Sequence, residues 1–430
     1  METIASDHTF KSYLFFWGGQ LISILGSSII QFVIIFWIAD ITRSSIIVSI
    51  VYFLGSLPMV LIPPIIGVYI DRWNRKIVIA IADSLQAFTT FLIILFFISG
   101  IANIWLVISM NFLRGIFQAI HYPTVNSIIP IMIPRKYLSR MNAVNYLFTG
   151  IINVIGPIIG AILLAFFLID QILWVDIFTF FIAIVPLIFI TIPSISSSSE
   201  PNEKVSYIKE FKSGIRVLKS VKSFLILIIF ISVINLLNMP FTTQISLFVL
   251  EDHSGNELDL ALVSALLQAG IVIGAIIAFT KKHWKHKELI ILWSVFIGIS
   301  GYSITSLAPT GNFLLMGVGA LIHASMIPIA NTMFLTILQT KIPPESQGKV
   351  FSIVISIAAA ITPLGMIISG PLAELFGIRL LFIIVLFLQF VSIVVTWFFT
   401  NLKNIIHSES EEDSIKKEEE VSLRPEQIEF

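Results

Sequence analysis

The sequence predicts an all-α integral membrane protein whose twelve transmembrane helices form two bundles of six. Three observations support this fold class. Of the 430 residues, 57% are hydrophobic and 12% are charged, and the mean hydropathy of +0.96 is too high for the limited interior of a soluble domain. Apolar runs long enough for a helix to cross the hydrocarbon core recur along the chain. The sequence lacks the short alternating segments that are typical of membrane β-barrels.

These apolar runs define the expected spans. The first run follows a short polar N-terminus, is too long for a signal peptide and lacks a clear cleavage site, so we expect it to remain as a helix. Hydropathy places the twelve spans at 13–39, 44–70, 77–99, 103–125, 142–168, 171–192, 223–250, 260–280, 288–308, 312–338, 350–371 and 377–401.

The basic residues indicate the orientation of these spans. If both termini are cytoplasmic, all but three of the 26 Lys and Arg lie on the inner side. Arg43 and Arg379 then fall outside, and Arg114 lies within the fourth span. Because Lys and Arg gather in cytoplasmic loops, we expect a multi-pass protein of the plasma membrane with both termini inside the cell.

The longest interval between spans predicts a division into two halves. In the linker, apolar residues from Ile208 to Leu218 recur at steps of three and four, which predicts an amphipathic helix on the inner leaflet. A solvated helix without membrane contact is the alternative. We expect an N-terminal six-helix bundle at 1–192, a cytoplasmic linker at 193–222, a C-terminal six-helix bundle at 223–401 and an acidic, disordered cytoplasmic tail at 402–430.

Internal repetition supports the same division. A shift of 209 residues pairs Ile133-Pro134 with Ile342-Pro343 and Gly156 with Gly365. The match is weak residue by residue, but the plan of six spans followed by six repeats with the same period. Such repeats occur in membrane proteins that are built from two related bundles.

A densely charged loop between the second and third spans carries the first resemblance to a known family. Its pattern, Gly67-x-x-x-Asp71-Arg72-x-Asn74-Arg75-Lys76, resembles the cytoplasmic loop motif of the major facilitator superfamily. The resemblance implies that the glycine allows close helix approach, the aspartate meets a helix N-terminus and the basic residues face the inner leaflet.

The loop departs from the family pattern at one position. Asn74 stands where the family commonly has glycine, and asparagine also tolerates a left-handed turn. The counterpart in the second half, Lys281-Lys282-His283-Trp284-Lys285, keeps the charge but lacks the aspartate. We expect Asp71 to meet the second-half helix that starts near Val350 and to support an outward-facing state.

Two further motifs resemble those of the same superfamily. Arg114-Gly115-x-x-Gln118 is similar to its fourth-helix motif, and an arginine within the membrane is a candidate for function. A purely structural arginine that pins backbone carbonyls or a carboxylate is the alternative. Gly156-Pro157-x-x-Gly160 resembles the motif of the antiporter branch, in which a kinked helix with little side-chain bulk slides on its neighbour. An ordinary packing kink is the alternative.

Across all twelve spans, the chain resembles the macrolide-efflux type of this superfamily, to which siderophore exporters are also similar. The segments Trp17–Ser23 and Gln347–Ser352 contribute to the resemblance. It implies a proton-coupled antiporter that exports hydrophobic or amphipathic small molecules by alternating access. Export of a siderophore or metabolite, import of a solute, and a transporter-like receptor or scaffold that signals through the acidic tail are the alternatives.

The sequence also bounds cofactors and partners. It has no glycine-rich ATP loop, no His-Glu-x-x-His pattern and no nucleophile elbow, so we expect neither an enzyme nor an ATP-driven pump. No cofactor and no metal are expected. The net charge of zero does not indicate nucleic-acid binding, and the lack of cysteine excludes disulfides. The expected partners are a small-molecule cargo, protons and the lipid bilayer, with the chain as a monomer.

Ionisable residues in or near the spans are the candidates for proton coupling. In an antiparallel hairpin of the third and fourth spans, Asp83 and His121 lie at similar depth, and Arg114 lies about 7–8 Å closer to the membrane centre. These three groups are expected to form one polar ladder that exchanges a proton, with a static helix lock as the alternative. Asp176 is expected near the outer end of the sixth span, in a position open to water.

A cargo cavity between the halves is expected to have large apolar walls and few polar points. His323, alone in the tenth span, is more typical of a satisfied packing histidine. The residues that we expect in spans facing the cavity are Gln31, Phe32, Phe36, Asn145, Asn235, Asn238, Phe241, Gln268 and His323.

Overall fold

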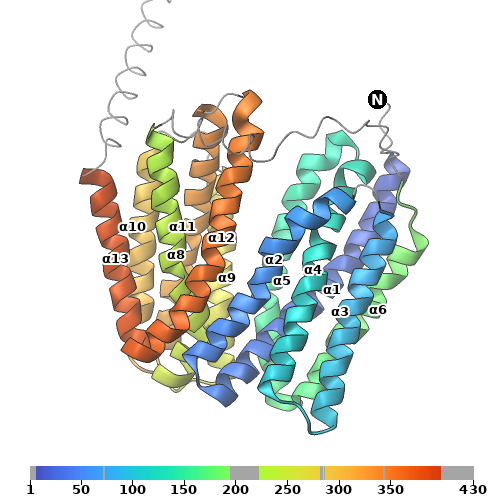
Figure 1. Cartoon of the computed structure of the whole chain (residues 1–430), viewed down its shortest axis with the longest axis horizontal. Coiled ribbons are helices and arrows are strands. Elements are labelled where there is room, and N and C mark those ends of the chain that lie inside the picture. Colours follow the sequence, from blue (N-terminus) through green and yellow to red (C-terminus); the bar gives the residue numbers. More distant parts are fainter. Residues whose placement is uncertain are drawn as a thin grey trace, which may run out of the picture.

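The computed structural model describes residues 6–70, 73–193, 222–280, 284, 286–341 and 344–398. These residues form twelve long helices and no strand (Figure 1). Eleven of the helices are long and apolar enough to cross a membrane, and the twelfth, α12, has a shorter apolar part at Ala360–Phe376. The prediction of an all-α membrane protein with twelve spans is therefore confirmed.

Six helices come from each half of the sequence. Within the first half α3 packs on α4, and α1 packs on α5 and α6. The helices of the first half are α1 (Asp7–Thr42), α2 (Ser45–Ile70), α3 (Arg75–Ile98), α4 (Ile104–Met132), α5 (Arg135–Phe166) and α6 (Ile169–Phe189).

The second half repeats this plan. Here α11 packs closely on both α9 and α10, and α12 packs on α8. The elements of the second half are α8 (Lys222–Leu247), its π-helical continuation η1 (Phe248–Asp252), α9 (Glu257–Thr280), α10 (Lys287–Ser306), α11 (Phe313–Lys341), α12 (Pro344–Phe376) and α13 (Ile378–Phe398).

The 209-residue repeat is visible in the helix bounds. The helices α11, α12 and α13 each begin 209 residues after α4, α5 and α6, and α11 and α13 also end 209 residues after α4 and α6. The repeat extends to a helix cap. Asn103 accepts a hydrogen bond from the backbone N–H of Leu106, and Asn312, 209 residues later, accepts one from Leu315. Each side chain satisfies a backbone donor at a helix start.

The charged loop after α2 differs from the expectation at Asn74. This residue has φ −70° and caps α3, accepting hydrogen bonds from the backbone N–H groups of Lys76 and Ile77. Its side chain is used as a cap, so no left-handed turn is needed. Lys76 in turn donates from Nζ to the carbonyl oxygens of Ile188 and Ile190, at the end of α6.

Several predicted features lie outside the described residues. These are Asp71 and Arg72 of the loop, the linker helix and the acidic tail. Gly67 belongs to α2, and Arg75 is the first residue of α3. The helix expected to start near Val350 is α12, which begins at Pro344.

The two halves meet most closely at the end of the molecule opposite the N-terminus (Figure 1). At this end Arg43, between α1 and α2, bonds to Glu251 of η1 at 2.7 Å, and Glu374 of α12 accepts a hydrogen bond from Ser44 at 2.7 Å. The main contacts between the halves are those of α2 with α12 and of α5 with α9.

A buried polar cluster joins the halves beneath these surface contacts. The amide nitrogen of Gln244 donates to Ser49 Oγ at 2.7 Å, and Ser369 Oγ lies 2.9 Å from Ser49 Oγ and 2.6 Å from Thr243 Oγ1. All four side chains are buried. Among the described residues, Gln244 Oε1 has no hydrogen-bond partner.

A buried histidine also lies at this end of the molecule. His253 follows η1, and its Nε2 accepts a hydrogen bond from Arg379 at 3.1 Å. Burial, and then the positive charge of Arg379, lowers the pKa of His253 below its ordinary value of 6.5. The folded protein therefore favours the neutral imidazole.

The glycines of the antiporter-like motif contact α1. A Cβ at Gly156 would meet Ser28, and a Cβ at Gly160 would meet Phe32. Both contacts lie within the first half, whereas Gly150 packs on Val272 of α9 in the second half. The lack of a side chain at Gly156 and at Gly160 thus allows α5 to approach α1 closely.

Candidate functional site

A cavity of about 660 Å³ lies between the two halves. All six helices of the first half contribute to its wall, which includes Pro157 within α5. The second half supplies a smaller part from α8, α9 and α12, and its lining residues are Thr242, Ile245, Ser264, Leu267, Gln268 and Met366.

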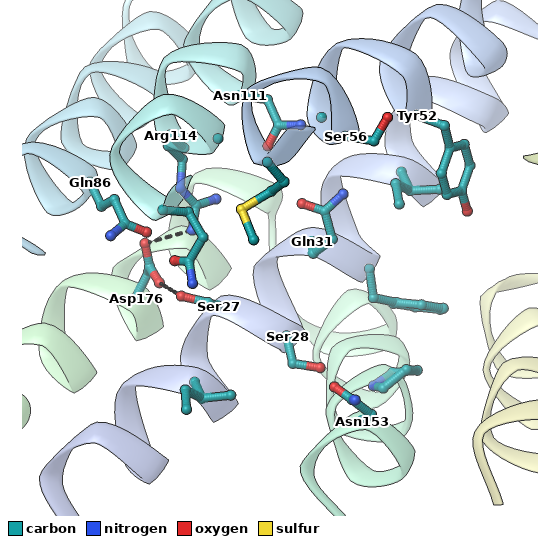
Figure 2. Close-up of a pocket in the computed structure, with 18 of the residues that line it drawn as sticks. Ser27, Ser28, Gln31, Tyr52, Ser56, Gln86, Asn111, Arg114, Asn153 and Asp176 are labelled. Carbon is teal, nitrogen blue, oxygen red and sulfur yellow. Dashed lines mark hydrogen bonds and ion pairs between the residues drawn. The ribbon is translucent and has the colours of Figure 1, made fainter. Parts of the chain in front are cut away.

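The polar side chains of the cavity are concentrated on the first half. Figure 2 shows Ser28 and Gln31 of α1, Asn111 of α4 and Asn153 of α5 around a common space. Apolar side chains such as Phe32 and Ile35 lie between them along the wall. The cavity therefore offers both hydrogen-bonding groups and apolar surface to a bound molecule.

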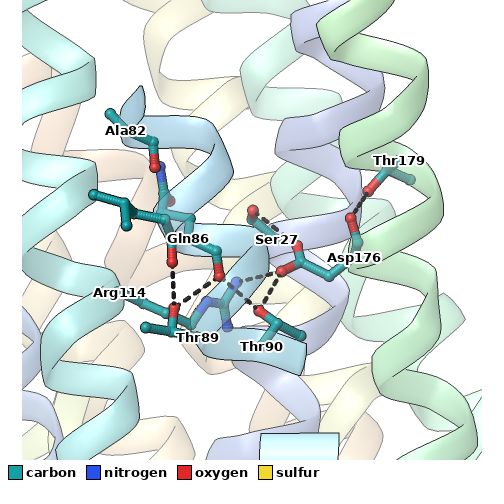
Figure 3. A network of polar contacts seen from close by, with 9 residues as sticks. Ser27, Ala82, Gln86, Thr89, Thr90, Arg114, Asp176 and Thr179 are labelled. Carbon is teal, nitrogen blue, oxygen red and sulfur yellow. Dashed lines mark hydrogen bonds and ion pairs between the residues drawn. The ribbon is translucent and has the colours of Figure 1, made fainter. Parts of the chain in front are cut away.

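One wall of the cavity carries a buried ion pair. Arg114 of α4 donates to Asp176 Oδ2 of α6 at 3.1 Å, and both side chains are more than nine-tenths buried. Asp176 also accepts hydrogen bonds from Thr90 Oγ1 at 2.6 Å and from Ser27 Oγ at 3.3 Å (Figure 3). The carboxylate is thus held by three helices in addition to its own.

The pair contains one unused donor. Among the described residues, Arg114 Nε has no hydrogen-bond partner although it is buried. An unpaired polar group in such a place is costly unless water or a ligand reaches it. Since Arg114 lines the cavity, its guanidinium is able to bond to a molecule bound there.

A second group of polar side chains lies on the same wall. Asp83 Oδ1 of α3 is 3.1 Å from His121 Nε2 of α4, and Gln20 of α1 donates to Asp83 Oδ2 at 3.3 Å. All three side chains are buried and line the cavity. His121 Nε2 has no hydrogen-bond partner among the described residues, although the Asp83 carboxylate is near it. The ring is therefore not aligned for a hydrogen bond to Asp83, and the two side chains are at ion-pair distance only.

The structure differs from the single polar ladder expected from the sequence. Asp83 and His121 are neighbours as the hairpin register predicts, but Arg114 bonds to Asp176 instead of joining them. Asp176 is buried among three partners, where the sequence reading places it in a position open to water. The reason is that α6 packs on α3 and α1, which a hairpin of α3 and α4 alone does not reveal.

Three of the residues expected in the cavity line it: Gln31, Phe32 and Gln268. Two of the others have side-chain partners elsewhere. Asn145 accepts a hydrogen bond from Trp17 Nε1 at 2.9 Å, and Asn238 accepts one from Gln389 at 2.7 Å. The expected residues that are not among the lining residues of this cavity are Phe36, Asn145, Asn235, Asn238, Phe241 and His323.

Phe241 and His323 belong to an aromatic cluster in the second half. The Phe241 ring packs against Tyr302, His323 and Phe382, with centroids 4.5, 5.1 and 5.8 Å away. His323 Nδ1 lies 3.0 Å from the carbonyl oxygen of Gly298. His323 is thus a satisfied packing residue, the alternative that the sequence analysis favours. Phe36 is likewise packed against the apolar core.

The sequence reading missed Gln20, Ser27 and Thr90 as partners of the carboxylates. A signal for them is present in the sequence. Gln20 and Ser27 are seven residues apart on α1, as are Asp83 and Thr90 on α3. Two helical turns separate residues at this spacing, so each pair lies on one face of its helix.

The sequence from residue 16 to residue 363 matches the family model described as Major Facilitator Superfamily. Macrolide efflux protein A of Streptococcus pyogenes is 26% identical over 368 residues, which cover 84% of this chain and 89% of the relative. The multidrug efflux pump Tap of Mycolicibacterium fortuitum is 23% identical over 351 residues, covering 79% and 84%.

Solved structures share the fold at low identity. A bacterial homolog of the human lysosomal transporter Spinster, in an inward-facing and unoccupied conformation, has a TM-score of 0.69 at 14% identity and covers 91% of this chain and 97% of its own. A bacterial homologue of the iron transporter ferroportin, in an inward-facing state, has a TM-score of 0.67 at 14% identity and covers 90% and 98%.

Proposed function

Because the chain belongs to the major facilitator superfamily, a family of membrane transporters, we propose that it exports hydrophobic or amphipathic small molecules in exchange for protons. The resemblance to the macrolide-efflux type of this family is confirmed by the named relatives, and the expectation of a non-enzymatic carrier is confirmed with it. The cargo, the direction of transport and the coupling to protons are the proposal.

The cavity supports a cargo of this kind. Its volume of about 660 Å³ lies within the range of roughly 300–1,000 Å³ that is usual for sites of drug-sized ligands. Amide and hydroxyl groups on the first half suit the polar atoms of an amphipathic molecule. The apolar residues Ile245, Leu267 and Met366 of the second half suit its hydrocarbon surface.

The ion pair of Arg114 with Asp176 is the observation that carries the proposed coupling. It is buried and lines the cavity, so a proton and a cargo are able to influence the same carboxylate. When Asp176 takes up a proton, its attraction to Arg114 is lost, and the helices that the pair joins are free to shift. We assign Asp83 and His121, which lie on the same wall of the cavity, to the path of that proton.

Alternating access suits the arrangement of the halves. Residues 1–192 and 223–401 are proposed to move as two units around the cavity, and the outer contacts of Arg43 and Ser44 break when it opens outward. With cytoplasmic termini in the plasma membrane, the present form opens inward. The close approach of α5 to α1 at Gly156 and Gly160 keeps the first half together during the movement.

Energised inside-out vesicles test the proposal. Vesicles that contain the chain are given a panel of macrolides, cationic dyes and iron chelators, with and without a protonophore. We expect uptake of at least one amphipathic compound that stops when the pH gradient is removed. Asp176→Asn should abolish gradient-driven accumulation, whereas Ser300→Ala, at an exposed residue of α10, should not. Uptake that ignores the gradient for every active compound would overturn the antiport proposal.

A further inference from the structure

The polar residues of the first half form two layers along the cavity wall, two helical turns apart. We propose that the layer of Gln20, Asp83 and His121 is a proton relay between water at the inner end of the cavity and the ion pair of Arg114 with Asp176. This inference rests on the proposed proton coupling and divides the roles within it. Asp176 exchanges the proton, and His121 carries it to and from the cytoplasmic side.

The layers repeat on three helices with one spacing. On α1 Gln20 precedes Ser27 by seven residues, on α3 Asp83 precedes Thr90 by seven, and on α4 Arg114 precedes His121 by seven. At a rise of 1.5 Å per residue the layers are about 10.5 Å apart. Since α1 and α3 run in one direction and α4 in the other, the same three helices supply both layers.

Polar residues also fill the interval between the layers. Ser23 of α1, Gln86 of α3 and Gln118 of α4 each lie between the two layer residues of their helix, and all three line the cavity. On each helix the spacing of three and four residues keeps these side chains on one face. Such a polar strip holds water, through which a proton crosses a gap that is too long for direct transfer.

His121 is the group of the relay layer to which we assign the transfer of the proton. It lines the cavity, and its Nε2 is 3.1 Å from the Asp83 carboxylate without a hydrogen bond to hold it there. A static helix lock would align this ring with the carboxylate. The unaligned nitrogen is instead available to a water molecule in the cavity, and the Asp83 carboxylate lies beside it.

The charges around this layer are few. From α4 the groups that face Asp83 are His121 and, two turns away, Arg114, and α1 supplies the neutral Gln20. From α6 Asp176 belongs to the other layer, where it pairs with Arg114. Gln20 is a positioning residue, because its amide fixes one carboxylate oxygen and leaves the other toward His121.

The proton step conserves atoms and charge. A proton released by the Asp176 carboxyl group passes to cavity water, and water passes a proton to Nε2 of His121. The ring then releases that proton to water at the inner end, and Asp176 returns to the carboxylate that pairs with Arg114. No oxidant, reductant or other reactant takes part.

The test uses the purified full chain in proteoliposomes, with radiolabelled erythromycin as the probe. Three quantities are measured: the initial rate of gradient-driven uptake across pH, the final accumulation, and cargo exchange without a pH gradient. For His121→Gln we expect the initial rate to fall by roughly tenfold or more, since positioned proton-transfer groups typically contribute about 10²-fold or more. Final accumulation and exchange should stay as in the wild type, because a relay sets the rate and not the stoichiometry.

His323→Gln is the matched control. His323 is as buried as His121, but it lies outside the cavity and bonds to a backbone carbonyl. Its variant should keep the wild-type dependence of rate on pH. If His121→Gln does not fold, Asp83→Asn has the same shape as the native residue and keeps an oxygen for Gln20. It should slow gradient-driven uptake in the same way.

The possible outcomes separate the relay from the proposed function. A wild type without gradient-driven uptake of erythromycin or of any other compound of the vesicle panel removes the proposed function and the relay together. A coupled wild type with an unchanged rate and pH profile in His121→Gln removes the relay alone. Loss of accumulation in His121→Gln would make His121 the coupling group itself, and this too would overturn the relay.

Discussion

Separating the two partners of the buried ion pair should destabilise the protein unequally. Removing one partner of a buried pair leaves an uncompensated charge and typically costs about 3–5 kcal/mol. In Arg114→Met the Asp176 carboxylate keeps its hydrogen bonds from Thr90 and Ser27. Hydrogen bonds to a charged group contribute about 1.5–3 kcal/mol each, so we expect a loss near the lower end, about 3 kcal/mol.

The opposite change should cost more. In Asp176→Leu the guanidinium of Arg114 loses its only acceptor among the described residues, and its Nε is already without a partner. We expect a loss near 5 kcal/mol, the upper end of the range for a broken buried pair. The double variant should recover most of the stability, because no buried charge remains.

Unfolding of the purified variants in detergent, followed by tryptophan fluorescence against denaturant, measures these differences. A double-mutant cycle then gives the coupling energy of the pair. The double variant should be folded and unable to accumulate cargo. Equal stability of the two single variants, or a double variant less stable than both, would refute the reasoning.

Three further predictions concern other parts of the chain. Gly274→Ala should destabilise the fold by about 1–3 kcal/mol, since its Cβ would overlap the carbonyl oxygen of Ser325 in α11, whereas Gly18→Ala, with open space around it, should be neutral in the same unfolding assay. Below a pH of 6.5 the unfolded chain protonates His253 and the folded one resists, so stability should fall as the pH drops, and His253→Asn should flatten a titration of the unfolding midpoint. Asn103→Ala and Asn312→Ala should each cost about 0.5–2 kcal/mol, and unequal losses by denaturant unfolding would show that the repeated caps are not equivalent.

Much of the fold was accessible from the sequence because its signals are local. Span length, the excess of basic residues on one side and the repeat depend on composition over about 20 residues, and tertiary packing changes them little. The 209-residue repeat is clearer in the helix bounds of the structure than in the residue types of the sequence. The start of α12 at Pro344 keeps the 209-residue interval from Arg135, whereas hydropathy alone placed the span start at 350.

The site was harder to predict from the sequence, because it depends on the orientation of each helix about its own axis. A hairpin register brings Asp83 near His121, since both are on neighbouring helices joined by a short turn. The partner of Arg114 comes from α6, which follows later in the chain and meets α3 and α1 by packing. In the same way, Asn145 and Asn238 are polar residues within spans and so were expected in the cavity. Their side chains instead accept hydrogen bonds from Trp17 and Gln389. Which face a helix turns inward is not encoded in its hydropathy.

The buried polar cluster between the halves, formed by Ser49, Thr243, Gln244 and Ser369, has a consequence for how the two halves separate. If the interface between the halves were apolar here, its separation would expose hydrophobic surface to water. The hydroxyl groups of Ser49, Thr243 and Ser369 can instead replace their hydrogen bonds to one another by hydrogen bonds to water, with a small net change in free energy. Gln244 Oε1 has no hydrogen-bond donor among the described residues. A buried acceptor without a partner costs about 1–3 kcal/mol, so a water molecule that reaches this oxygen should bind favourably. We therefore expect water to enter the interface first at Gln244, inside the polar cluster, before the helices of the two halves separate.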